Sequence, residues 1–229
     1  MLPWTLLGRA PIPGSAERLV LWQRGDEFSI RISGYVSELM NSRVHGSEEA
    51  LATEACALLR GAASARVLVG GLGMGFTLAA ALRTLGDAAQ VTVAELVPEV
   101  VAWNQGPLGE AAGRPLEDGR VSVQIRDVAE LIRAAQASYD AVLLDVDNGP
   151  QGMTHTENHW LYTPAGLAAA RRALRPGGVL AVWSATREEA FTRRLTAAGY
   201  AVQVQTVRAR TGADGRGRGA RHTIWLARV

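Results

Sequence analysis

From Arg66 onward the chain alternates short apolar runs with amphipathic stretches, and this alternation limits the fold more than any other feature of the sequence. The apolar runs are "ARVLVGG", "AQVTVAEL", "RVSVQIRD", "YDAVLLDV" and "GGVLAVWSA". A helix-like segment, such as "FTLAAALRTL" or "PAGLAAARRAL", follows each of them. Strands that alternate with helices form a parallel sheet with helices on both faces. The sequence therefore predicts a doubly wound α/β fold.

The end of the chain departs from this alternation. The strand patterns "YAVQVQTVRAR" and "RHTIWLARV" have only the loop "TGADGRGRGA" between them. Two strands joined by a loop without a helix pair in antiparallel fashion. We therefore expect a mostly parallel, Rossmann-like sheet of seven strands, closed by a C-terminal antiparallel hairpin. This is the layout of class I S-adenosyl-L-methionine (AdoMet)-dependent methyltransferases.

The segment before the alternating region has a different pattern. Residues 17–33, "ERLVLWQRGDEFSIRIS", alternate apolar and polar side chains around Arg24-Gly25-Asp26, which predicts a β-hairpin. The stretch "HGSEEALATEACALL" then predicts a helix with Ser47 as its N-cap. We expect a reduced N-terminal β-hairpin appendage over residues 1–40 and a nucleoside-binding transferase domain over residues 41–229.

Composition excludes several classes of protein. The basic residues are all arginine, so a Schiff-base lysine and a P-loop lysine are both ruled out. A single cysteine, Cys56, excludes an internal disulfide and a cysteine-clustered zinc site. The net charge of +2 gives no argument for nucleic acid. Without an apolar run of roughly 18 residues or a leader-like start, we expect a cytoplasmic protein that does not bind a membrane.

A glycine loop joins the first strand of the alternating region to its helix. In "VLVGGLGMGF", Gly71, Gly73 and Gly75 allow close approach of a ligand to the backbone and positive φ angles. The dinucleotide fingerprint requires a glycine where this chain has Phe76, which disfavours a nicotinamide oxidoreductase. The alternative is a tight turn that binds nothing.

Three acidic residues follow three successive strands. Glu95 lies twenty residues after Gly75, at the spacing expected for a carboxylate that accepts hydrogen bonds from ribose hydroxyls. Asp127 follows the next strand and can cap its helix, accept from an adenine amine, or do both. Asp145 follows the strand after that. The carboxyl ends of such strands line one crevice, so an adenosine site accounts for all three.

The segment after Asp145 offers candidate acceptor-binding groups. Asp147 and Asn148 can orient or deprotonate an acceptor, although Asp, Asn, Gly and Pro are also favoured turn residues. His155 and His159 follow, and either can act as a general base. A metal site there is disfavoured because no third ligand is in view. Trp183, at the end of a strand, could flank the acceptor.

Several of these segments together resemble one known family. "VLVGGLGMGFTLAAAL", "VAELVPEVVAWN", "RDVAELI", "YDAVLLDVDNGP" and "LYTPAGLAAARRALRPGGVLAVW" are similar to the spermidine synthase-like (polyamine aminopropyltransferase) branch of the class I AdoMet-dependent transferases. The resemblance covers residues 26–184, including "RVHGSEEAL". It implies a nucleoside thioether donor with its ribose on Glu95, its adenine near Asp127 and Val128, and its sulfonium tail near Asp145.

The chain departs from this family at three places. Family members carry an aspartate inside the glycine loop, where this chain has Met74. They have a larger N-terminal β-domain. Their Asp-x-x-Asp-Pro motif, whose second aspartate deprotonates the acceptor amine, is altered to "DVDNGP", which brings either Asn148 or Asp147 to that position.

These observations lead to one expected function and two alternatives. Because of Met74, we expect AdoMet as donor and methyl transfer to a small-molecule acceptor. The first alternative is aminopropyl transfer from decarboxylated AdoMet to a polyamine, whose cationic groups could bind the acidic residues Glu48, Glu49, Asp147 and Glu157. The second is a catalytically silent nucleoside-binding protein. A homodimer is the default expectation for assembly.

The predicted site has two groups of residues. The donor-binding group is Gly71, Gly73, Met74, Gly75, Glu95, Leu96, Asp127, Val128 and Asp145. The predicted catalytic group is Asp145, Asp147, Asn148 and His155.

Overall fold

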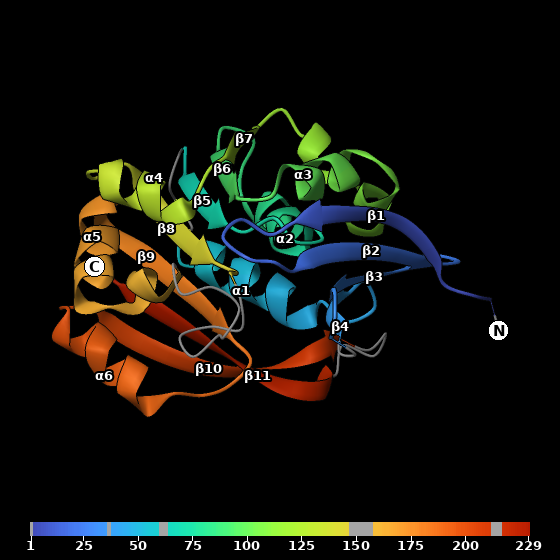
Figure 1. Cartoon of the computed structure of the whole chain (residues 1–229). Coiled ribbons are helices and arrows are strands. Elements are labelled where there is room, and N and C mark those ends of the chain that lie inside the picture. The colour runs from blue at the N-terminus through green and yellow to red at the C-terminus, as the bar shows by residue number, and fades with distance from the viewer. Residues whose placement is uncertain (1, 36–37, 60–63, 147–157, 212–216) are drawn as a thin grey trace.

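The chain folds into two sheets, and helices cover the larger one on both faces (Figure 1). The computed structural model describes residues 2–35, 38–59, 64–146, 158–211 and 217–229. The larger sheet has seven strands in the order β10-β11-β9-β8-β5-β6-β7. Their bounds are β5 (Arg66–Gly70), β6 (Gln90–Glu95), β7 (Val121–Ile125), β8 (Tyr139–Leu144), β9 (Leu174–Ser184), β10 (Ala201–Thr211) and β11 (Gly217–Arg228).

The strand directions confirm the predicted fold class. Strands β5 to β9 pair in parallel, whereas β11 pairs antiparallel with both β9 and β10. The C-terminal hairpin is therefore present, and it lengthens the sheet beyond its parallel part.

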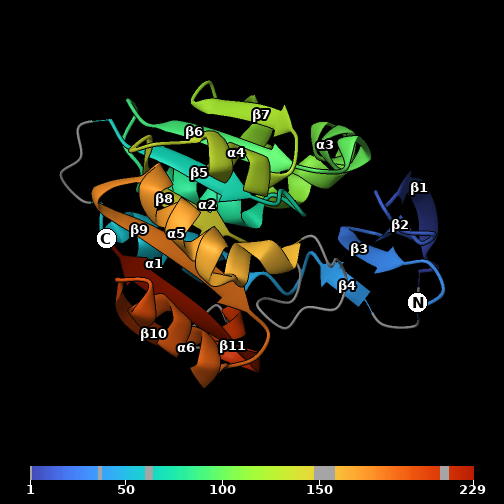
Figure 2. The same cartoon turned by 60° about the vertical axis from the view of Figure 1, so that its left-hand side comes forward.

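Each face of the seven-stranded sheet carries its own hydrophobic core. Successive side chains of a strand point to opposite faces, so Val67 and Val69 of β5 lie in one core and Leu68 lies in the other. The first core is covered by α1 (Gly46–Ala57), α2 (Phe76–Thr84) and α3 (Pro98–Gln105). The second is covered by α4 (Val128–Ala134), α5 (Pro164–Ala173) and α6 (Glu189–Ala197). Figure 2 shows α4 and α5 in front of the sheet and α1 behind it.

Short 3₁₀ helices complete the connections. They are η1 (Pro107–Ala112), η2 (Pro115–Glu117) and η3 (Asn158–Tyr162). The predicted cap of α4 is confirmed, because the Asp127 side chain accepts from the backbone there. Pro98 opens α3, where its missing N–H costs nothing.

The N-terminal appendage is a four-stranded antiparallel sheet rather than a lone hairpin. The predicted hairpin is present as β2 (Arg18–Arg24) and β3 (Glu27–Ile32), with Gly25 at a φ of 61° in its turn. Strands β1 (Thr5–Pro11) and β4 (Glu38–Asn41) extend it on either side. Most side chains of β1 are exposed on both faces, so its sequence lacks the alternation that identified the hairpin. The division into an appendage and a transferase domain stays a prediction.

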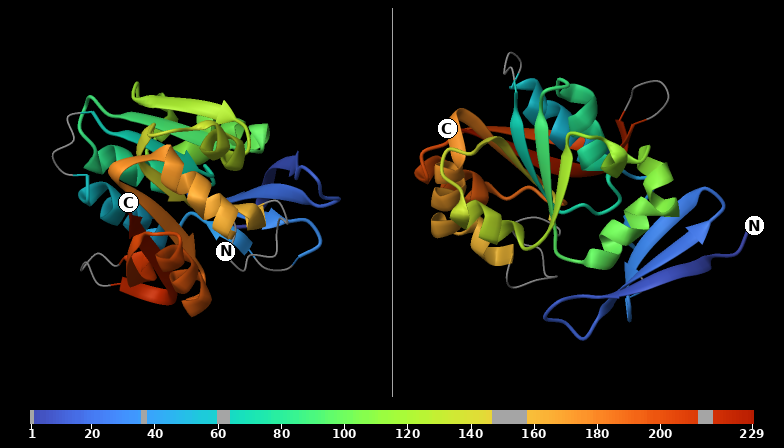
Figure 3. Two further views of the ribbon diagram at one scale, coloured as in Figure 1. Left: turned by 90° about the vertical axis from the view of Figure 1, so that its left-hand side faces the viewer. Right: turned by 90° about the horizontal axis from the view of Figure 1, so that it is seen from above.

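The N-terminal sheet packs beside α3 and contributes to the first core (Figure 3). Ala10, Leu21 and Ile30 are buried together with residues of β5, α1 and α2. At Gly8 of β1 the contact with α3 is close, because a Cβ atom there would lie 2.6 Å from Nε1 of Trp103. The two sheets therefore share one hydrophobic core.

The predicted N-cap of α1 is wrong. The helix begins at Gly46 with His45 at the N-cap position, and Ser47 lies inside the first turn. The Ser47 hydroxyl is buried and contacts side chains instead of backbone N–H groups. Among the helices of the described residues, none is both long and apolar enough to cross a membrane.

Candidate functional site

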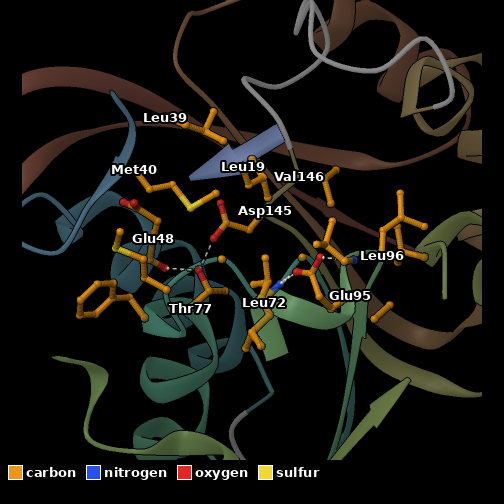
Figure 4. A pocket seen from close by; sticks show the side chains of 18 of the residues that line it. Leu19, Leu39, Met40, Glu48, Leu72, Thr77, Glu95, Leu96, Asp145 and Val146 are labelled. Carbon is orange, nitrogen blue, oxygen red and sulfur yellow. Dashed lines mark hydrogen bonds between the residues drawn. The ribbon is translucent and has the colours of Figure 1, made fainter. Parts of the chain in front are cut away.

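A cavity lies where the carboxyl ends of β5, β6 and β8 face the N-terminal sheet (Figure 4). One wall is apolar and comes from the N-terminal sheet, with Leu19, Ile32 and Met40 among its side chains. The other wall comes from the glycine loop and from the ends of β6 and β8. The crevice predicted at the strand ends is therefore present, and a second sheet covers it.

The glycine loop has a backbone that other residues would not adopt. Gly71, Gly73 and Gly75 have φ angles of 86°, 53° and 85°. At Gly71 a Cβ atom would lie 2.5 Å from the carbonyl oxygen of Asp145, so even alanine would push the loop away from β8. Gly75 is the N-cap of α2, which brings the N-terminal end of that helix to the cavity. Met74 also lines the cavity and is almost fully buried.

Glu95 fastens the glycine loop to β6. Its side chain is 8% exposed. Oε2 accepts a hydrogen bond from the backbone N–H of Leu72, and Oε1 accepts from that of Val97, both at 2.9 Å. Burial raises the pKa of Glu95, and these backbone hydrogen bonds act in the opposite direction. Glu95 also lines the cavity, so its carboxylate belongs both to the loop and to the space that a ligand could enter. Leu96 lines the cavity beside it.

Asp127 has a structural role that the sequence predicted. Its Oδ1 accepts from the backbone N–H of Ala129 at 2.8 Å, which caps α4. Asp127, Val128 and Arg126 all line the cavity at the end of β7. An adenine contact for Asp127 and Val128 stays a prediction.

Asp145 lies next to Thr77, between Glu48 and Glu95 in the view of Figure 4. Its Oδ2 is 2.5 Å from the hydroxyl of Thr77, which donates to it. Burial raises the pKa of Asp145 to about 6, although the Thr77 hydrogen bond acts to lower it. Burial, followed by the nearby charge of Asp145, raises the pKa of Glu48 to about 7. The carboxyl groups of Glu48 and Asp145 are therefore close enough to influence each other's ionisation.

Sequence reasoning did not identify Thr77 or Met40. Thr77 is the second residue of α2, directly after the glycine loop, and that position was the signal that could have identified it. Met40 lies on the short strand β4, and its sulfur would be 3.1 Å from a Cβ atom at Gly73. No periodic pattern connects it to the loop, which is 33 residues further along the chain (73 − 40).

The structure describes some of the remaining predicted residues and does not describe others. Asp147, Asn148, His155 and Glu157 lie outside the described residues. His159 is described, is exposed, and does not belong to the described lining of the cavity. Trp183 of β9 lines the cavity, as its predicted place beside an acceptor requires, and its ring also contacts that of His222 edge to face.

The cavity combines carboxyl groups with apolar side chains. In Figure 4 Asp145 lies between Glu48 and Glu95, and Leu19, Leu39, Met40 and Leu72 are among the apolar residues around them. The glycine loop has positive φ angles and no side chains at Gly71 and Gly73, where a Cβ atom would clash with Asp145 or press against Met40. A ligand in the cavity can therefore approach the loop backbone. Together, the strand order, the glycine loop and the acids at the strand ends define a class I AdoMet-dependent transferase-like fold.

The family model described as "Spermine/spermidine synthase domain" matches residues 55–198. These residues include the glycine loop, Glu95, Asp127 and Asp145. The match covers more than half of the chain, so the chain belongs to the spermine/spermidine synthase family. No curated protein matches the chain in sequence.

Solved structures agree with this family at the level of the fold. A spermidine synthase in complex with the transition state analogue AdoDATO is 17% identical with a TM-score of 0.72, over 97% of this chain and 72% of that one. Spermidine synthase from Thermotoga maritima is 18% identical with the same TM-score and coverage. A probable spermidine synthase from Corynebacterium glutamicum is 16% identical with a TM-score of 0.62, over 98% and 79% of the two chains.

Proposed function

We propose that this protein is a polyamine aminopropyltransferase that uses decarboxylated AdoMet as donor. The observation that supports this function best is a cavity lined by Glu95, Asp145 and Glu48, in a chain of the spermine/spermidine synthase family. The family favours aminopropyl transfer over the methyl transfer that Met74 suggested at first. The carboxyl groups of Glu48 and Asp145 also suit the amine of the donor's tail, which is a cation at neutral pH.

In this proposal each residue of the cavity binds or orients a reactant. Glu95 accepts from the ribose hydroxyls while its backbone hydrogen bonds hold the glycine loop. Asp145, fixed by Thr77, lies beside the cationic end of the donor. When bound, decarboxylated AdoMet supplies a carbon next to a sulfonium sulfur, which leaves as a neutral thioether with the C–S electron pair when the acceptor amine attacks.

The acceptor amine must lose a proton in this reaction. Most of the acceleration comes from holding the two reactants in the right orientation in a site that excludes water. The apolar wall from Leu19, Ile32 and Met40 excludes water from the reacting groups. Asp147, Asn148 and His155 stay our predicted groups for orienting or deprotonating the amine.

Methyl transfer from AdoMet is the second candidate. Its supporting observation is Met74, a buried apolar side chain at the loop position where the family resemblance implies a carboxylate for the donor's amine. With that carboxylate absent, a donor that keeps its own carboxylate would meet less repulsion from the loop.

Incubation with each donor separates the candidates. We expect purified protein, decarboxylated AdoMet and putrescine to form spermidine and methylthioadenosine, detected by mass spectrometry. Glu95→Gln should reduce the rate strongly. Methylated products with AdoMet, and no spermidine, would instead support methyl transfer. Nucleoside binding without any product would support the silent nucleoside-binding protein.

A further inference from the structure

The carboxyl group of Glu48 reaches the donor site from a different part of the chain than Asp145 does. Glu48 lies in the first turn of α1, and Asp145 follows β8, yet both line the same cavity. Thr77 joins them, because its hydroxyl is 2.5 Å from the carboxylate of Asp145 and 3.3 Å from the carbonyl oxygen of Glu48. Figure 4 shows both carboxyl groups on the same side of Glu95, with Asp145 between Glu48 and Glu95.

A hydrogen-bonded line from the C-terminal hairpin holds the Glu48 side chain in place. The Ser47 hydroxyl lies 2.6 Å from Oε2 of Glu48 and 2.8 Å from Nδ1 of His222 on β11. Ser47 is fully buried, and His222 in turn packs against Trp183 of the cavity wall. The orientation of Glu48 is therefore supported by Ser47 of α1 and, through it, by His222 of β11 and Trp183 of β9.

No described side chain neutralises this pair of carboxyl groups. Within the described part of the chain neither Glu48 nor Asp145 forms an ion pair, whereas the adjacent Glu49 pairs with Arg83 at 2.8 Å. Both Glu48 and Asp145 are half-buried. Two neighbouring carboxyl groups disfavour each other's ionisation, and a cation between them removes that cost. The carboxyl groups thus lack a positive partner at the place where the proposed donor has its amine.

We propose that Glu48 and Asp145 together bind the primary ammonium group of the donor, and that Glu48 supplies the carboxylate that the glycine loop lacks at Met74. This inference rests on the proposed function and specifies its donor. Glu48 is a specificity-determining residue, because the Glu48–Asp145 pair repels the α-carboxylate of AdoMet. Decarboxylated AdoMet lacks that carboxylate and is not repelled. Like-charge contacts of this kind discriminate strongly against the wrong ligand.

Binding of three ligands tests the inference without relying on turnover. Decarboxylated AdoMet has the ammonium group, AdoMet has both the ammonium and the carboxylate, and methylthioadenosine has neither. Calorimetric titration of the native protein should give the tightest binding for decarboxylated AdoMet. In Glu48→Gln this affinity should fall about 10- to 100-fold, the range for losing a charge-assisted hydrogen bond, while methylthioadenosine binds within about twofold of native.

Glu49→Gln is the matched control, because it removes the same charge from the neighbouring residue of α1, whose partner is Arg83. It should leave all three affinities within about twofold of native. Equal binding of decarboxylated AdoMet to the native protein and to Glu48→Gln would overturn the inference. If spermidine still forms in that case, the proposed function stands without it. If none of the three ligands binds the native protein, both are overturned.

Proton release gives a second measurement that needs no variant. The charged and titratable groups around Glu48 are Asp145 beyond β8, Glu49 on α1, and His222 on β11 through Ser47. The pKa values of about 7 for Glu48 and about 6 for Asp145 leave the pair partly protonated at pH 6.5. Ammonium binding should expel up to about one proton, seen as a buffer-dependent enthalpy. The same enthalpy in buffers of different ionisation heat would contradict the inference.

Discussion

Single carboxyl groups determine how this cavity is organised, and Glu95 illustrates how. Its two oxygens accept from the backbone of Leu72 in the glycine loop and of Val97 after β6. The residue that is predicted to bind ribose therefore also fixes the loop against its strand. A substitution at Glu95 should change both ligand binding and stability.

Glu95→Gln allows the effect on ligand binding and the effect on stability to be measured separately. The amide must turn one N–H donor toward a backbone N–H, which leaves a buried donor unsatisfied and costs about 1–3 kcal/mol of unfolding free energy. We expect methylthioadenosine affinity to fall at least tenfold as well. Urea unfolding and calorimetric titration measure the two effects. An unchanged affinity in a destabilised protein would limit Glu95 to a structural role.

The pair Glu48 and Asp145 should make stability depend on pH. Both pKa values are raised in the folded protein, so the folded state holds more protons than the unfolded state between about pH 4 and pH 7. The free energy of unfolding should therefore fall as the pH rises through this range. Glu48→Gln should remove about 1–3 kcal/mol of that decrease. Urea unfolding at pH 5 and pH 8 checks this, and parallel curves for the two proteins would refute it.

At the scale of elements, the loop between β5 and α2 holds the site together. The loop backbone passes so close to the end of β8 that Gly71 cannot be replaced without movement. It also receives a hydrogen bond from Asn104 of α3, whose amide donates to the carbonyl oxygen of Gly73 at 2.9 Å. Together with Glu95 of β6, the elements β8 and α3 thus fix the path of this turn.

Gly71→Ala should test this constraint. The added Cβ clashes with the carbonyl oxygen of Asp145 at a φ of 86°, so we expect a loss of about 1–3 kcal/mol in unfolding free energy and weaker nucleoside binding. Gly86→Ala is the control, because a Cβ there has no atom within 4 Å and its φ is not positive. Thermal unfolding of both variants should show a decrease for Gly71→Ala alone. Equal melting temperatures would contradict this account.

At the scale of the whole molecule, the N-terminal sheet and the α/β sheet share a core and line one cavity. Elements that share a core unfold together in small proteins. We therefore expect a single cooperative unfolding transition for the full chain rather than separate melting of the appendage.

Gly8→Val should disturb this junction. Its side chain would press against the indole of Trp103 and move β1 away from α3, so we expect a lower melting temperature and weaker ligand binding together. Leu6→Ala, an exposed position on the same strand, should change stability by about 0.5 kcal/mol or less. Two separate transitions in the native protein, or a loss of stability in Gly8→Val without a loss of binding, would show that the sheets act independently.

Local patterns predicted much of this molecule, and contacts between distant segments account for the rest. The five strand-and-helix repeats and the acids that end their strands follow from periodicity and spacing, and the structure brings Glu95, Asp127 and Asp145 to one cavity as expected. Ser47 has the residue type of an N-cap, yet His222, 175 residues away, uses its hydroxyl. Strand β1 was not predicted because most of its side chains are exposed, so it lacks a regular alternation of apolar and polar residues.

The two walls of the cavity come from separate stretches of sequence. Leu19, Ile32, Leu39 and Met40 precede residue 42, whereas Glu48, Glu95 and Asp145 all follow it. The first stretch therefore lines the cavity without a charged side chain, and the second supplies all of its described charged groups together with apolar residues such as Met74 and Trp183. If the proposed function holds, divergence or directed evolution confined to the first 41 residues can alter which acceptors fit, while the carboxyl groups proposed to bind the donor stay as they are.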